Sequence, residues 1–243
     1  MSVPHQVRAT ARTYLLTVTA VRNVGPRMRR VTLSGDELAD FSPWPGQDVV
    51  FHLSDEAGSG VRRRYTVRNL DRDARQFDVD FVLHGPGPGA DWARLVRPGE
   101  RVEVFGPRGK VPMSDASWQL FAGDESALPA IAEMVEALPA HARAVALVEV
   151  QDADDEQPVN PRAELDLRWL YRGTIGPGVA TTLDEALASV KLPASDRHLF
   201  FFAESRIVRR LRDAASGRGV TASEISAKGY WNVGRASRDG GAG

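Results

Sequence analysis

Residues 64–68 place two cations, a hydroxyl and an aromatic ring in one short segment, Arg64-Tyr65-Thr66-Val67-Arg68. In an extended strand Arg64, Thr66 and Arg68 share one face, and Tyr65 and Val67 share the other. A flavin nucleotide uses such groups: a guanidinium for the pyrophosphate, a hydroxyl for the polar ring edge and an aromatic side chain against the ring. An exposed edge strand in a chain with 28 Arg and 3 Lys would look the same, so spacing alone leaves both interpretations open.

A glycine-rich segment follows at residues 84–90, with the sequence HGPGPGA, and leads into Asp91-Trp92. A glycine-rich turn that opens a helix offers free N–H groups to a phosphate. The two prolines remove some of these donors, and a tight connection between a strand and a helix is the alternative interpretation.

A strand–glycine–helix junction is expected at residues 121–130, with the sequence FAGDESALPA. It lacks the G-x-G-x-x-G fingerprint of dinucleotide-binding folds. Gly123 would let a nicotinamide cofactor approach the strand end, and Pro129 suits a first helical turn. A generic connection between a strand and a helix would share these features.

Two adjacent aromatic residues, Tyr230 and Trp231, lie near the end of the chain within the segment Lys228–Gly234. They could cap a cofactor ring. A last strand that buries one of them in the core is the alternative interpretation.

The composition limits the classes of protein that can carry these segments. The chain has 243 residues, is 42% hydrophobic, has a net charge of −1 and contains no cysteine. This excludes a disordered or fibrous chain, disulfide bonds and thiolate chemistry, and it gives no basic excess for nucleic acid. The longest uncharged run, Gly173–Leu183, has 11 residues, too few to span a bilayer, and residues 1–12 lack the apolar core of a signal peptide. We therefore expect a cytoplasmic protein without membrane insertion.

The elements that must position these segments fall into two domains. Six short alternating segments with turn signals between them predict an antiparallel β-barrel over residues 12–115, with a helical insertion at 90–96. From residue 116 to 234, strands alternate with helices, which predicts an α/β domain with a doubly wound parallel sheet. One of its helices should open with a capping box at Thr182-Leu183-Asp184-Glu185. Residues 235–243 are expected to form a flexible tail.

The order of these segments resembles the siderophore-interacting protein family, the flavin-dependent ferric-siderophore reductases within the ferredoxin–NADP reductase superfamily. The resemblance covers residues 12–234. It is carried by 64–68, Asp80–Gly85, Gly87–Ala90 with Trp92-Ala93, Pro98-Gly99-Glu100, Gly106–Gly109, Ala122–Ile131 and Gly229-Tyr230-Trp231.

The resemblance implies FAD held between the two domains, with NADH or NADPH as electron donor and a ferric siderophore as substrate. It assigns no protein acid or base, no metal ligand and no oligomeric state. The residues that it implies for the cofactor are Arg64, Tyr65, Thr66, Val67, His84, Gly87, Gly89, Ala90, Trp92, Asp124, Glu125, Ser126, Ala127, Tyr230 and Trp231.

Two positions depart from the family pattern. Asn232 stands where the family usually has Arg after the Tyr-Trp pair, and Ser126 stands where Thr is frequent. The first departure removes a cation that could hold an anionic ferric chelate, and Lys228 or Arg235 could replace it. A basic rim that includes Arg64 and Arg68 should attract acidic chelates.

The acidic segment Gln151–Asp155, after the strand at 145–150, bears on the electron donor. Acidic groups at such a strand end favour a ribose 2′-hydroxyl and repel a 2′-phosphate, which favours NADH. Three other functions stay open: a flavin reductase for another acceptor, a flavin or siderophore binder without catalysis, and a structural protein without a cofactor.

Overall fold

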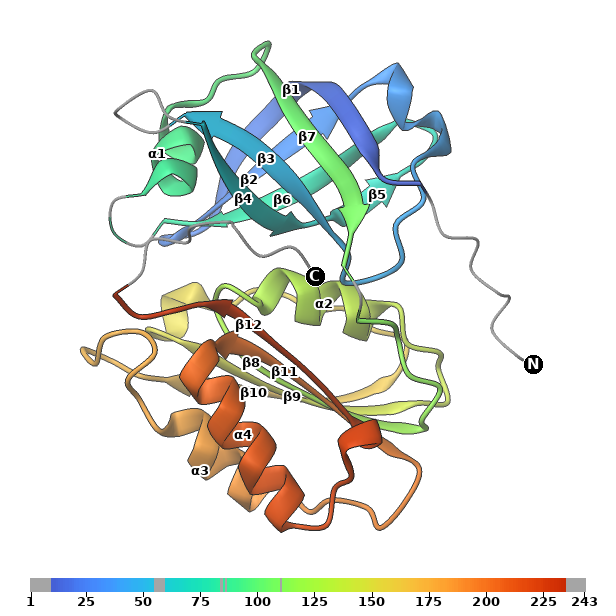
Figure 1. Cartoon of the computed structure of the whole chain (residues 1–243), viewed down its shortest axis with the longest axis vertical. Coiled ribbons are helices and arrows are strands. Elements are labelled where there is room, and N and C mark those ends of the chain that lie inside the picture. Colours follow the sequence, from blue (N-terminus) through green and yellow to red (C-terminus); the bar gives the residue numbers. More distant parts are fainter. Residues whose placement is uncertain (1–9, 55–59, 84, 86, 110, 235–243) are drawn as a thin grey trace.

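The computed structural model describes residues 10–54, 60–83, 85, 87–109 and 111–234. It contains two sheets, an antiparallel one formed by the first half of the chain and a parallel one formed by the second half (Figure 1). The two stack one above the other, and helix α2 (Leu128–Glu136) lies between them. None of the described helices has the length and apolar character that crossing a bilayer requires.

The first sheet has seven strands in the order β4-β3-β7-β1-β2-β6-β5, and its neighbours pair antiparallel. The strands are β1 (Arg12–Gly25), β2 (Met28–Ser34), β3 (Asp48–Ser54), β4 (Gly60–Thr66), β5 (Arg68–Asp71), β6 (Gln76–Val82) and β7 (Arg101–Arg108). A short 3-10 helix, η1 (Asp36–Asp40), follows β2, and helix α1 (Pro88–Leu95) follows β6. The predicted antiparallel architecture is confirmed.

The sheet curls around an apolar core, so that strands far apart in its order come into contact. Tyr65 of β4 and Phe81 of β6 have ring centroids 4.1 Å apart. Phe51 and Trp92 complete this cluster, with each ring centroid 5.2–5.3 Å from that of Phe81. The aromatic cluster closes the end of the barrel that carries α1, because Trp92 lies on that helix.

The prediction of one continuous strand over residues 64–68 is wrong. The strand breaks at Val67, which is 3% exposed in the core, and Arg68 begins β5. Arg68 is itself 5% exposed and binds Glu133 and Glu136 of α2 at 2.9 and 2.7 Å. It therefore joins the two domains and does not belong to an exposed basic rim.

The second sheet is parallel, with five strands in the order β10-β9-β8-β11-β12, as expected. They are β8 (Trp118–Asp124), β9 (Arg143–Val150), β10 (Glu164–Tyr171), β11 (Arg197–Glu204) and β12 (Ile225–Trp231). Helix α2 covers the face toward the barrel, while α3 (Thr182–Ser189) and α4 (Ser205–Gly217) cover the other face. Two 3-10 turns, η2 (Ala153–Asp155) and η3 (Ala222–Glu224), complete the domain.

The predicted capping box at Thr182 is wrong. The N-cap of α3 is Thr181, and its hydroxyl donates to Glu185 at 2.7 Å. Thr182 is the first helical residue, and its hydroxyl donates to the carboxylate of Glu149. A capping box occurs instead at η3, between Thr221 and Glu224.

Candidate functional site between the barrel and the parallel sheet

The segment 64–67 and the glycine-rich segment before α1 lie in direct contact. A Cβ added to Gly89 would lie 1.8 Å from the Tyr65 hydroxyl oxygen and 3.1 Å from Cζ of the same ring. Only a residue without a side chain therefore lets α1 sit against β4. Two segments that the sequence analysis selected separately are thus packed together, and Arg64 and Thr66 flank Tyr65 on β4.

The start of α1 offers main-chain donors. The first N–H groups of a helix have no acceptor within the helix, and after Pro88 these are the groups of Gly89 and Ala90. The N–H of Gly87 donates to the Asp91 carboxylate at 2.9 Å, so that donor is already engaged. No atom lies within 4 Å of where a Cβ would stand at Gly85 or Gly87, so the turn borders open space.

The last strand brings the carboxyl-terminal aromatic residues to the same surface. Tyr230 of β12 lies against the Thr66 side chain of β4, and burial raises the pKa of its phenol. Phe202 packs against the other side of Tyr230, with ring centroids 5.6 Å apart. Tyr230 thus contributes to the core of the parallel domain and to the contact with the barrel, and its role in capping a cofactor ring stays a prediction.

Asp48 links Arg64 to Lys228 across the domain boundary. It opens β3, is 4% exposed and accepts from Nε of Arg64 at 3.2 Å and from Nζ of Lys228 at 3.0 Å. The sequence analysis missed Asp48. Its only signal is a carboxylate at the head of an otherwise apolar run, which is costly to bury unless it is paired.

Asp124 anchors the turn at the carboxyl end of β8. It is 1% exposed and accepts from the N–H of Ser126 at 3.0 Å, the N–H of Glu204 at 3.1 Å and the indole N–H of Trp231 at 2.8 Å. The carboxylate thereby fixes Trp231 at the end of the last strand. Its oxygens are engaged within the protein, which makes Asp124 a residue that positions its neighbours.

The close approach predicted at Gly123 is made by the chain itself. A Cβ there would lie 2.3 Å from the Phe202 carbonyl oxygen and 2.9 Å from the Ala127 side chain. Ala127 is fully buried beneath this junction. The glycine therefore allows β8, β11 and the start of α2 to pack together.

Glu125 forms a buried ion pair with Arg172, at the end of β10. Both contacts are 2.7 Å, and the side chains are 11% and 4% exposed. Burial, and then the neighbouring Asp124, raise the pKa of Glu125 to about 7, against the opposing effect of Arg172. The carboxylate is thus committed to Arg172, a partner that the sequence analysis did not identify.

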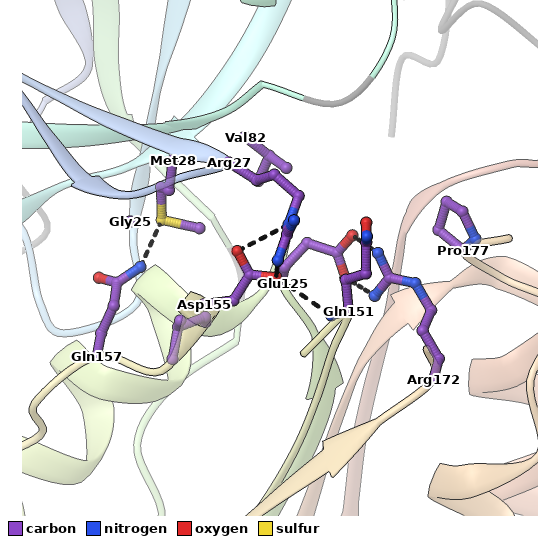
Figure 2. Close-up of a pocket in the computed structure, with 11 residues that line it drawn as sticks. Gly25, Arg27, Met28, Val82, Glu125, Gln151, Asp155, Gln157, Arg172 and Pro177 are labelled. Atoms are coloured by element: carbon purple, nitrogen blue, oxygen red, sulfur yellow. Dashed lines mark hydrogen bonds and ion pairs between the residues drawn. The ribbon is translucent and has the colours of Figure 1, made fainter. Parts of the chain in front are cut away.

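A small cavity of about 80 Å³ lies beside this ion pair, between β1, β2 and the ends of β8 to β10 (Figure 2). Its volume suits ordered water and is too small for a ring system. Arg27 crosses its wall and binds Asp155 at 2.8 Å and Asp152 at 2.5 Å. Two of the three carboxylates on which the NADH preference was based are therefore already paired with a cation from the barrel.

The surface formed by β4, the start of α1 and β12 suits a phosphate-bearing aromatic cofactor. It includes the Arg64 guanidinium, the Thr66 hydroxyl and the N–H groups of Gly89 and Ala90, which have no acceptor within the helix. These are the donors that a pyrophosphate requires. Trp92 points into the aromatic cluster of the barrel, and Val67 is in the core, so these two contribute support. His84 and Arg235, also selected from the sequence, lie outside the described residues.

Comparisons with known proteins identify the family to which this fold belongs. A family model described as siderophore-interacting protein matches residues 116–234, and one described as siderophore-interacting FAD-binding domain matches residues 49–111. The crystal structure of a siderophore utilization protein from T. fusca is 32% identical, with a TM-score of 0.85, and the match covers 93% of this chain and 95% of that one.

Two relatives have named activities. Ferric vibriobactin reductase ViuB of Vibrio cholerae is 31% identical over 179 residues, which cover 65% of this chain and 66% of that protein. The NADPH-dependent ferric-chelate reductase of Escherichia coli is 27% identical over 253 residues, which cover 95% of this chain and 97% of that protein.

Proposed function

The chain belongs to the siderophore-interacting protein family, and from this we propose that it is a flavoprotein that reduces ferric siderophores with NAD(P)H. The observation that carries the proposal is the contact between Tyr65 and Gly89, which packs the start of α1 against the strand that carries Arg64 and Thr66. The named reductases among its relatives support the reaction type.

We assign the cofactor to the surface between β4, α1 and β12. Arg64 and the N–H groups of Gly89 and Ala90 would hold the pyrophosphate, and Thr66 would bind the polar edge of the ring. Tyr65 supports this surface, because its ring is fixed between Phe51 and Phe81. Bound there, FAD would supply the capacity for hydride transfer from the nicotinamide and for single-electron transfer to Fe(III).

The protein's own contribution is orientation. Asp124 holds Trp231 and Ser126 at the strand ends where ligands of parallel sheets bind, and the Glu125–Arg172 pair fixes the neighbouring turn. Electron transfer to chelated iron needs no protein acid or base. The iron arrives as part of the substrate, and Fe(II) leaves because hard oxygen ligands bind it less tightly than Fe(III).

We place this activity in the cytoplasm, where a cell keeps its reduced nicotinamide cofactors. The ferric siderophore is the proposed small-molecule partner. The preference between NADH and NADPH rests on the segment 151–155, where Arg27 neutralises two of the acidic side chains.

Three measurements on the purified protein test the proposal. Bound flavin should give an absorbance band near ~450 nm, and NADH or NADPH should bleach it under anaerobic conditions. Addition of a ferric siderophore with an Fe(II) trap should then restore the oxidised spectrum and yield trapped Fe(II). Bleaching without trapped Fe(II) would indicate a flavin reductase for another acceptor. Flavin that no nicotinamide bleaches would indicate a binder, and a colourless protein that takes up no FAD would refute the proposal.

A further inference from the structure

Lys228, the described cation closest to the Tyr-Trp pair along the chain, is already paired. Its Nζ lies 3.0 Å from Oδ2 of Asp48, a carboxylate whose side chain is 5% exposed. A buried carboxylate without a cation is costly, so this ion pair is retained in the folded protein. The expectation that Lys228 binds an anionic chelate therefore conflicts with the contact it makes.

The cations of the segment 64–68 are also engaged. Arg64 donates to the other oxygen of Asp48 at 3.2 Å, and the proposed function commits its remaining donors to a pyrophosphate. Arg68 is held by Glu133 and Glu136. Bound FAD would add negative charge to this surface. There the Asp48 carboxylate already offsets the charge of one of its two cationic partners, Arg64 and Lys228. Lys228 and the two arginines of residues 64–68 therefore contribute little free positive charge for a highly anionic substrate.

Asn232 directly follows the last strand, β12, which ends at Trp231. On that strand Lys228 contacts Asp48 of the barrel, and Tyr230 lies against Thr66. Asn232 is exposed and carries no charge. The next residue, Val233, is 41% exposed. Gly178 packs against the side chains of Trp231 and Val233, and its neighbour Val179 is 62% exposed. The exposed side chains that follow the last strand, Asn232 and Val233, are thus uncharged.

We propose that this protein selects ferric chelates of little or no net charge, and that Asp48 and Asn232 determine the selection. Three hydroxamates around Fe(III) cancel its charge, whereas three catecholates leave a net charge of −3. The inference rests on the proposed function and specifies its substrate class. Asp48 acts by engaging Lys228, and Asn232 acts by placing an uncharged side chain directly after the last strand.

Binding of redox-inert Ga(III) chelates to the FAD-saturated protein tests this inference separately from turnover. Ga(III) has the charge of Fe(III), so a Ga(III) tris-hydroxamate and a Ga(III) tris-catecholate differ in net charge by three units. Tryptophan fluorescence or calorimetry gives the two Kd values. We expect tighter binding of the hydroxamate complex. Tighter binding of the catecholate complex would overturn the inference and leave the proposed function standing, while binding of neither complex would overturn the proposed function.

Substitution at Asn232 tests the electrostatic explanation. Asn232→Arg should tighten binding of the tris-catecholate roughly three- to tenfold, less at high salt, and leave the hydroxamate Kd nearly unchanged. Ser216→Arg, at an exposed position near the end of α4, adds the same charge elsewhere and is the matched control. Equal effects of the two variants, or no effect of Asn232→Arg, would overturn the explanation.

Asp48→Asn provides a second test because it releases Lys228. With FAD content confirmed by absorbance, this variant should also bind the tris-catecholate more tightly than the wild type. A catecholate Kd that stays at the wild-type value in both variants would refute the assigned roles of Asp48 and Asn232.

Discussion

Trp231 donates its indole N–H to Asp124, a residue 107 positions earlier in the chain, over 2.8 Å. Trp231→Phe keeps an aromatic ring and removes this donor. Because Asp124 is 1% exposed, we expect a loss of about 1–3 kcal/mol in the free energy of unfolding. Denaturant titration measures it, with Trp169→Phe on the outer strand β10 as the control. Equal stability of the two variants would show that the hydrogen bond contributes little.

The contact between Gly89 and Tyr65 gives a prediction with an internal control. Gly89→Ala places a Cβ 1.8 Å from the Tyr65 hydroxyl oxygen, so either α1 or the ring must move. We expect lower stability, by about 1–3 kcal/mol, and weaker FAD binding. Gly87→Ala meets no atom within 4 Å and has an extended φ of 165°, so it should leave the free energy of unfolding nearly unchanged. Similar unfolding midpoints for the two variants would contradict the tight packing of α1 on β4.

Arg64 tests the cofactor site directly. Arg64→Ala removes the guanidinium proposed to bind the pyrophosphate, and FAD affinity should fall roughly ten- to hundredfold, the cost of a lost charge-assisted hydrogen bond. Titration of the apoprotein with FAD gives the Kd. Arg22→Ala, on an exposed part of β1, is the matched arginine control. An Arg64→Ala protein that binds FAD as tightly as the control would remove Arg64 from the site.

The raised pKa of Glu125 predicts a pH-dependent stability. Between its ordinary value of 4.5 and about 7, the unfolded chain loses this proton while the folded chain retains it. Ionisation therefore favours unfolding, and stability falls as the pH rises through this range. Relative to Glu125→Gln, the wild type should lose free energy of unfolding between pH 5 and pH 7.5. Parallel pH profiles of the two proteins would show that Arg172 keeps the carboxylate ionised throughout.

Arg27 offers a test of cofactor choice. Arg27→Ala leaves Asp152 and Asp155 without their cation, and the end of β9 becomes more negative. The kcat/KM for NADPH should fall several-fold more than that for NADH, because a 2′-phosphate is repelled and a 2′-hydroxyl is not. Steady-state rates with both donors measure the ratio. An unchanged ratio would place the ribose elsewhere.

Much of the fold was predictable because local patterns and global fold agree. Tyr14, Leu16 and Val18 alternate in the sequence and are all buried in the barrel core. Leu128, Ile131 and Val135 form one helical stripe, and all three are buried. Such periodicities depend only on neighbouring residues, so the sequence is sufficient to predict them.

The pairing of charges was not predictable in the same way. The ion pair between Lys228 and Asp48 joins residues 180 positions apart in the chain. Arg68 likewise pairs with two distant residues, Glu133 and Glu136 of α2. Arg64 and Arg68 look equivalent in the sequence, yet one is partly exposed and the other buried. Which cation is free and which is paired depends on how the domains dock, and no local pattern records that.

The position of β4 at one end of the strand order has a consequence for solubility. Within the described chain its ladder partner is β3 alone, so its outer main-chain groups could pair with the same strand of a second molecule. In such a pairing Arg62 and Arg64 of both copies would meet, and their like charges would repel. The arginines of this strand thus also discourage aggregation through its open edge.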